Sequence, residues 1–116
     1  MIAVIFEVEP HPDRREGYLA IAGRLRTELE GIDGFISVER FESLTRPGHL
    51  LSLSFFRDEE AVHRWRSTAE HRAAQTAGRN GIFAGYRLRI AHVLRDYGLT
   101  DREEAPADSR VLHDGA

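Results

Sequence analysis

The first residues of the chain have the pattern of a β-strand. Between residues 2 and 8 the even positions form a continuous apolar face of β-branched and aromatic side chains, whereas Glu7 and Glu9 belong to the opposite face. Pro10 and Pro12 then interrupt the alternation. The pattern predicts a strand over residues 2–8.

The next segment of the chain has the pattern of an amphipathic helix. Apolar side chains recur at helical spacing at Tyr18, Ile21, Ala22, Leu25 and Leu29. Asp13 and Glu16 have the spacing of a capping box, which predicts that the helix begins at Asp13, and Gly31 is a typical helix end.

Two more β-prone segments, residues 35–41 and 50–56, lie on either side of a turn at Pro47 and Gly48 and predict a hairpin. The sequence then predicts a helix that begins at Asp58 and runs to about Trp65. The acidic side chains that follow Asp58 would lie in the first turn, where they interact favourably with the positive end of the helix dipole. A second capping-box pattern at Ser67 predicts a break and another short helix over residues 70–77.

Residues 82–97 alternate like a strand in which both faces have side chains to bury. Tyr86, Leu88 and Ile90 share one face, and Arg87 and Arg89 share the other. About 14 residues exceed the usual five or six, so we expect this strand to extend beyond its own sheet and to need a partner.

The order strand, helix, strand, strand, helix pair, strand predicts an α+β fold. It is the ferredoxin-like arrangement, an antiparallel sheet with its helices on one face. The other face of the sheet would be bare and half apolar, which predicts burial by a second copy in a homodimer.

The amino-acid composition excludes several kinds of active-site chemistry. All sixteen basic side chains are arginine, and the absence of Lys and Cys excludes Schiff bases, thiolate nucleophiles, disulfides and iron–sulfur clusters. The net charge of −3 comes from residues 99–116, a polar segment without periodicity that we expect to be an irregular tail. Residues 1–98 form the predicted domain, and their neutral balance gives no sign of nucleic-acid binding.

No apolar run approaches the roughly 20 residues that cross a bilayer, and the N-terminus lacks the pattern of a signal peptide. We therefore expect a cytoplasmic protein that does not act on membranes.

Candidate site residues gather between Arg57 and Gln75. His71 and Gln75 are four residues apart on the last predicted helix and can meet the same ligand, unless they face solvent. Trp65 is either a core residue or the wall of a pocket for a planar ligand. Further walls could come from Phe6, Phe83 and Tyr86.

Arg87 and Arg89 could pair with a carboxylate or enolate oxygen of a ligand. The alternative is that they form ion pairs with Glu7 or Glu39 across the sheet. The histidines lack the spacing of a metal site, so we expect no metal.

These segments together resemble the antibiotic biosynthesis monooxygenase family over roughly residues 1–97. The resemblance rests on the opening strand, the segments at residues 34–42, 56–65 and 70–75, and the strand at residues 86–90. It implies a dimeric α+β barrel that binds a small molecule.

The family includes cofactor-independent oxygenases that turn phenols into quinones and oxygenases that degrade haem. By resemblance, Trp65 stands at the family's pocket tryptophan, His71 stands where quinone-forming members have a tyrosine, and Arg87 or Arg89 lies near their strand arginine. Haem is disfavoured, because Gln75 stands where the haem-degrading members have their iron-ligating histidine and Glu7 where they have an asparagine.

The resulting hypothesis is a homodimeric monooxygenase without metal or organic cofactor, acting on a small electron-rich aromatic or enolisable molecule. His71 would be the base and Arg89 would stabilise the anion, with Trp65 as pocket wall and Gln75 as orienting amide. The alternatives are a dimeric binding or stress-response module without turnover and, third, a haem-degrading oxygenase.

Overall fold

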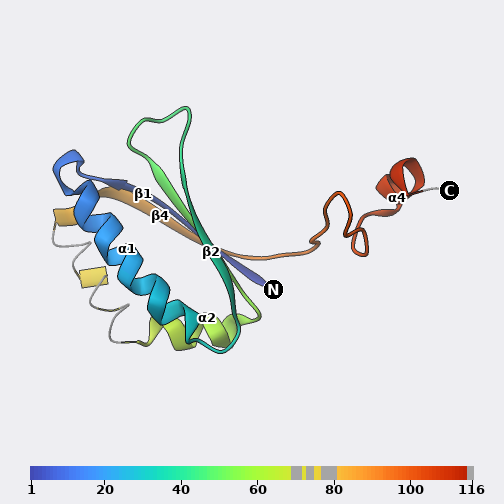
Figure 1. The fold of residues 1–116 in the computed structure, drawn as a ribbon, viewed down its shortest axis with the longest axis horizontal. Helices are drawn as coiled ribbons and strands as arrows, with labels where there is room; N and C mark the ends of the chain where they lie inside the picture. The colour runs from blue at the N-terminus through green and yellow to red at the C-terminus, as the bar shows by residue number, and fades with distance from the viewer. Residues whose placement is uncertain (69–71, 73–74, 77–80, 115–116) are drawn as a thin grey trace.

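The protein is a four-stranded antiparallel sheet covered on one face by helices (Figure 1). The computed structural model describes residues 1–68, 72, 75–76 and 81–114. The strands are β1 (Ile2–Pro10), β2 (Phe35–Glu42), β3 (Leu50–Phe56) and β4 (Phe83–His92), in the order β2-β3-β1-β4. Helices α1 (Arg15–Glu30) and α2 (Glu59–Arg66) lie on the same face. The predicted ferredoxin-like α+β fold is confirmed.

The last strand is shorter than the sequence pattern suggested. β4 ends at His92, whose register partner is Ile2, the first residue of β1. Among the strands that the structure describes, β4 pairs only with β1, so the ladder stops where β1 begins. The prediction of one continuous strand to residue 97 was therefore wrong.

The start of α1 also differs from the prediction. A short 3-10 turn, η1 (Pro12–Arg14), precedes the helix, and Arg14 occupies the N-cap position without a side-chain capping bond. Asp13 lies inside this turn, so the capping box expected from Asp13 and Glu16 does not form.

The start of α2 is as predicted. Asp58 Oδ1 accepts a hydrogen bond of 2.9 Å from the backbone N–H of Ala61, which is the N-cap interaction. This bond is the main cause that lowers the pKa of the Asp58 carboxyl. The following short helix expected over residues 70–77 lies largely outside the described residues, although Arg72, Gln75 and Thr76 are helical.

The core between sheet and helices is divided into two clusters. One contains Ile2, Val4, Leu29, Phe56, Ala61 and Val62. The other contains Val8, Tyr18, Ala22 and Leu50. Ser52 and Ser54 lie on β3 between Leu50 and Phe56 and share their helix-facing side. Because serine is small, the layer between sheet and helices is not filled at this place.

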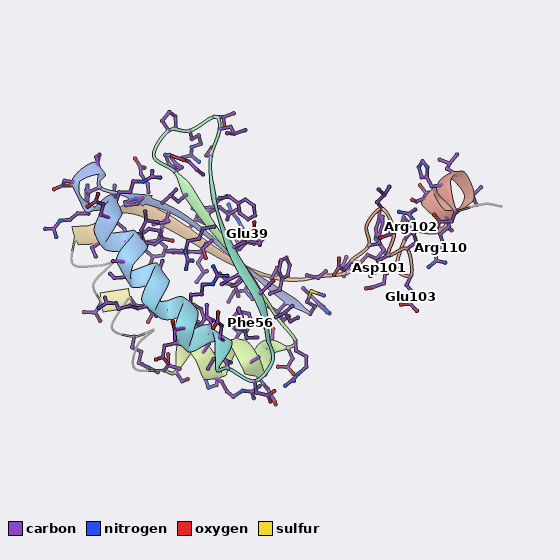
Figure 2. The ribbon with its side chains drawn as sticks, viewed as in Figure 1. Glu39, Phe56, Asp101, Arg102, Glu103 and Arg110 are labelled. Carbon is purple, nitrogen blue, oxygen red and sulfur yellow. The ribbon has the colours of Figure 1, made fainter. Side chains whose placement is uncertain are left out.

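The C-terminal residues are not the irregular tail that we expected. They leave the sheet as an extended arm and end in α4 (Ala107–His113) (Figure 1). Arg102 organises the arm: it donates to Gly98 O at 3.1 Å, pairs with Asp114 at 2.9 Å and donates to Ser109 Oγ. Figure 2 shows Arg102 and Arg110 within this arm, far from Phe56 in the domain core. Sequence periodicity missed α4 because polar bonds, not an apolar stripe, hold the arm together.

The arm also explains the dimensions of the molecule. Its radius of gyration is 17.0 Å and its longest extent is 56 Å, whereas about 13 Å is typical for a compact chain of this length. Within the described part of the chain, none of the helices has the length and apolar character required to span a membrane.

Candidate functional site

A cavity of about 370 Å³ lies between the helix-facing side of the sheet and helices α1 and α2. Most of its walls are apolar, with Val4, Phe6 and Leu88 from the sheet and Ile21 and Leu25 from α1. Among the described lining residues, the polar side chains are those of Tyr18, Arg40, Ser52, Ser54, Arg66 and Gln75, together with Trp65 and Tyr86. This volume and this mixture are typical of small-molecule sites.

The cavity exists because of the alternation in β3. Leu51, Leu53 and Phe55 point away from the helices, whereas Ser52 and Ser54 point toward them. In the middle of the strand the large apolar side chains therefore lie on the outer face of the sheet, and the two serines leave space beneath α1.

Five of the residues proposed from the sequence meet at this cavity. Trp65, Gln75, Phe6, Phe83 and Tyr86 all line it. Phe6, Phe83 and Tyr86 form an aromatic cluster with ring centroids 5.7 to 5.8 Å apart. Trp65 stacks on Phe56 with 5.9 Å between centroids, so a core side chain sets the position of the indole.

The two strand arginines proposed from the sequence do not line the cavity. Arg89 pairs with Glu7 at 3.1 Å, and both side chains are about half exposed. Arg87 is the register partner of Glu7 and shares this outer face of the sheet. The ion-pair alternative is therefore confirmed for Arg89.

His71, the proposed base, lies outside the described residues, and its role stays a prediction. Within the part of the chain that is described, no three His, Asp or Glu side chains are grouped as metal ligands.

Sequence reasoning missed Arg40 and the role of Tyr18. Arg40 lies on β2 opposite Ser52, and its guanidinium donates a 3.2 Å hydrogen bond to the carbonyl oxygen of Ala22 on α1. Burial raises the pKa of the Tyr18 hydroxyl, whereas the charge of Arg40 and a hydrogen bond with it act in the opposite direction. Arg40 shares a face with the apolar Val38, which was the signal available in the sequence.

Comparison with known proteins agrees with this architecture. The family model for antibiotic biosynthesis monooxygenases matches residues 1–77. A relative from Pyricularia oryzae, named jasmonate monooxygenase ABM, is 54% identical over 93 residues, which cover 80% of this chain and 43% of that protein. The chain thus spans less than half of the length of this relative. The uncharacterised protein YqjZ of Bacillus subtilis is 30% identical over 80% of this chain and 79% of its own length.

Solved structures show the same fold at low sequence identity. Rv0793 of Mycobacterium tuberculosis superimposes with a TM-score of 0.75 at 21% identity, covering 84% of this chain and 98% of that one. A crystal structure described as an antibiotic biosynthesis monooxygenase gives a TM-score of 0.70 at 14% identity, covering 81% and 99%. With the match over residues 1–77 and the 30% identity to YqjZ across most of both chains, these findings show that the chain belongs to the antibiotic biosynthesis monooxygenase family.

Proposed function

We propose that the protein is a monooxygenase that oxidises a small electron-rich aromatic or enolisable molecule without a metal or organic cofactor. The observation that carries this proposal is the apolar cavity of about 370 Å³ with its aromatic wall. Membership of the family supports the reaction type. The name of the Pyricularia relative supports an enolisable substrate, because jasmonate contains a ring ketone.

In this reaction the substrate supplies the electrons. Loss of a proton beside a ketone, or from a phenol, gives an anion that transfers electrons to O₂. One oxygen atom becomes a new carbonyl of the product and the other leaves as water, so no external reductant is needed. The protein must hold the anion and exclude bulk water, which an apolar cavity containing a cation can do. The base that we propose is His71.

The test is oxygen consumption with jasmonic acid and with a dihydroxynaphthalene. We expect Tyr86→Ala to lower kcat/KM about tenfold, because the ring of Tyr86 forms part of the cavity wall. Tyr86 is 51% exposed, so its removal should leave the fold intact. Tyr97→Ala is the matched control, since Tyr97 is 43% exposed and belongs to the arm.

If neither compound supports oxygen consumption above the rate without protein, the proposed activity is wrong. Binding without consumption would instead favour a small-molecule binding module.

We also propose that the protein is a homodimer through the outer face of its sheet. Ile5, Phe41, Leu51, Leu53 and Phe55 share this face, which no helix of the described chain covers. Light scattering should give about 26 kDa, twice the chain mass of 13.2 kDa. Leu53→Arg should yield monomers, whereas Leu44→Arg, at a fully exposed turn residue, should remain dimeric. A wild-type mass of 13.2 kDa would contradict the proposal.

A further inference from the structure

The charge on the cavity wall has one sign. Among the described lining residues there are two arginines, Arg40 and Arg66, and no aspartate, glutamate or histidine. A neutral apolar ligand would not require a guanidinium in such a wall. The lining therefore complements an anion.

Arg40 has donor capacity that the described residues do not use. One terminal nitrogen bonds the carbonyl of Ala22, while Nε is buried and has no acceptor. Glu42, on the same face of β2, is engaged by Arg15 at 3.2 Å. None of the described carboxylates forms a salt bridge with Arg40.

The buried Nε–H of Arg40 without an acceptor costs free energy, and the partly buried guanidinium without a counterion adds to this cost. A carboxylate would relieve both costs, because the planar guanidinium can donate two parallel hydrogen bonds to its two oxygens. The hydroxyl of Tyr18 lies beside the guanidinium, and Ser52 is its register partner. Further hydrogen-bonding groups thus lie close to the position of an anion.

Arg40 and the most exposed apolar lining residues lie at opposite edges of the sheet. Tyr86, Leu88 and Ile90 line the cavity from β4 and are 43% to 51% exposed, so the cavity opens along this edge of the sheet. Arg40 lies on β2, the opposite edge. A ligand that enters past β4 reaches Arg40 only after crossing the apolar side chains of β1.

From this arrangement we propose that the ligand is a monocarboxylic acid with an apolar body and that Arg40 binds its carboxylate. The inference deepens the proposed function, since it rests on the same cavity being the substrate site.

Binding can be measured without turnover by titrating the fluorescence of Trp65, the only tryptophan, under anaerobic conditions at pH 8. The probes are jasmonic acid and decanoic acid, each compared with its methyl ester. At this pH the acids are ionised, and the esters keep the apolar body without the charge. We expect each acid to bind at least about tenfold more tightly than its ester, which is the effect of a charge-assisted hydrogen bond.

Arg40→Met should remove this preference while leaving ester binding within about twofold of wild type. Arg26→Met is the control, since Arg26 pairs with Glu30 on the exposed surface of α1 and does not line the cavity, and it should keep the full preference. Arg40→Lys retains the charge but loses the two-pronged donor, so we expect at least about a threefold smaller preference. If Arg40→Met does not fold, the test is made with Arg40→Lys.

Equal binding of acid and ester by the wild type would overturn the proposal, as would binding of neither acid or a preference that persists in the folded Arg40 variants. These results are independent of oxygen consumption. Turnover of acid and ester at equal rates would leave the proposed function standing and exclude the carboxylate site. Acid-selective binding without turnover would support the carboxylate site and contradict the proposed activity.

Discussion

Replacing Phe56 with alanine is expected to lower the free energy of unfolding by about 3–5 kcal/mol. Phe56 is 0% exposed and is among the largest fully buried side chains of the domain. Its ring packs edge-on against Phe35 with centroids 5.8 Å apart and stacks on Trp65 at 5.9 Å. Its removal leaves a cavity that the two flanking rings, held by different elements, cannot close completely.

Chemical denaturation at one fixed protein concentration measures this loss, because dissociation of an oligomer makes stability depend on concentration. Leu44→Ala is the surface control and should change stability by less than about 0.5 kcal/mol, since Leu44 is 100% exposed. A loss below about 1 kcal/mol in Phe56→Ala would show that this ring is not part of the core. The variant should also shift the fluorescence of Trp65.

Gly34→Ala is expected to cost about 2–5 kcal/mol for two separate reasons. The φ angle of Gly34 is +92°, a conformation that residues with a Cβ rarely adopt. The added Cβ would lie 2.7 Å from Cβ of Ala61, which is completely buried in α2. The carbonyl of Gly34 also accepts a 2.7 Å hydrogen bond from the N–H of Arg57, so the turn cannot easily move away.

Gly48→Ala separates the two causes. Gly48 also has a positive φ, +82°, but among the described residues nothing beyond its two chain neighbours lies within 4 Å of the position of its added Cβ. We expect this variant to lose only about 1–2 kcal/mol, the cost of the backbone conformation alone. Equal losses in the two variants, measured by the same denaturation, would show that the contact with α2 contributes nothing.

Both predictions concern the end of the domain that positions Trp65. The turn at Gly34 packs against Ala61 of α2, and the ring of Phe56 stacks on the indole of Trp65. The wall of the cavity is therefore built on core residues that are completely buried. A loss of packing at this end should also weaken ligand binding.

Much of the fold could be predicted because its signals are local. The apolar alternation of β1, the hairpin of β2 and β3, and the cap at Asp58 each depend on residues within one element or its first turn. The aromatic cavity residues Phe6 and Tyr86 were also identified, because alternation along β1 and β4 places them on one face. Phe83, proposed with them, reaches this face through the register shift between Glu9 and Pro10.

The errors occurred where distant segments decide the outcome. β4 ends at His92 because its partner β1 begins at Ile2, ninety residues earlier in the chain. α4 was not predicted because its arm depends on bonds from Arg102, which no apolar period signals. The sequence left two roles open for Arg89, and the structure decided for the ion pair with Glu7.

The sequence by itself determined the order of strands and helices and therefore the ferredoxin-like arrangement, since periods of 2 and 3.6 residues specify each element locally. Only the tertiary structure decided which arginine lies at the cavity. A strand pattern separates two faces but does not say which of them the helices cover. Packing of α1 over Ser52 and Ser54 left the cavity open and placed Arg40 beside Ala22, eighteen residues away in the chain.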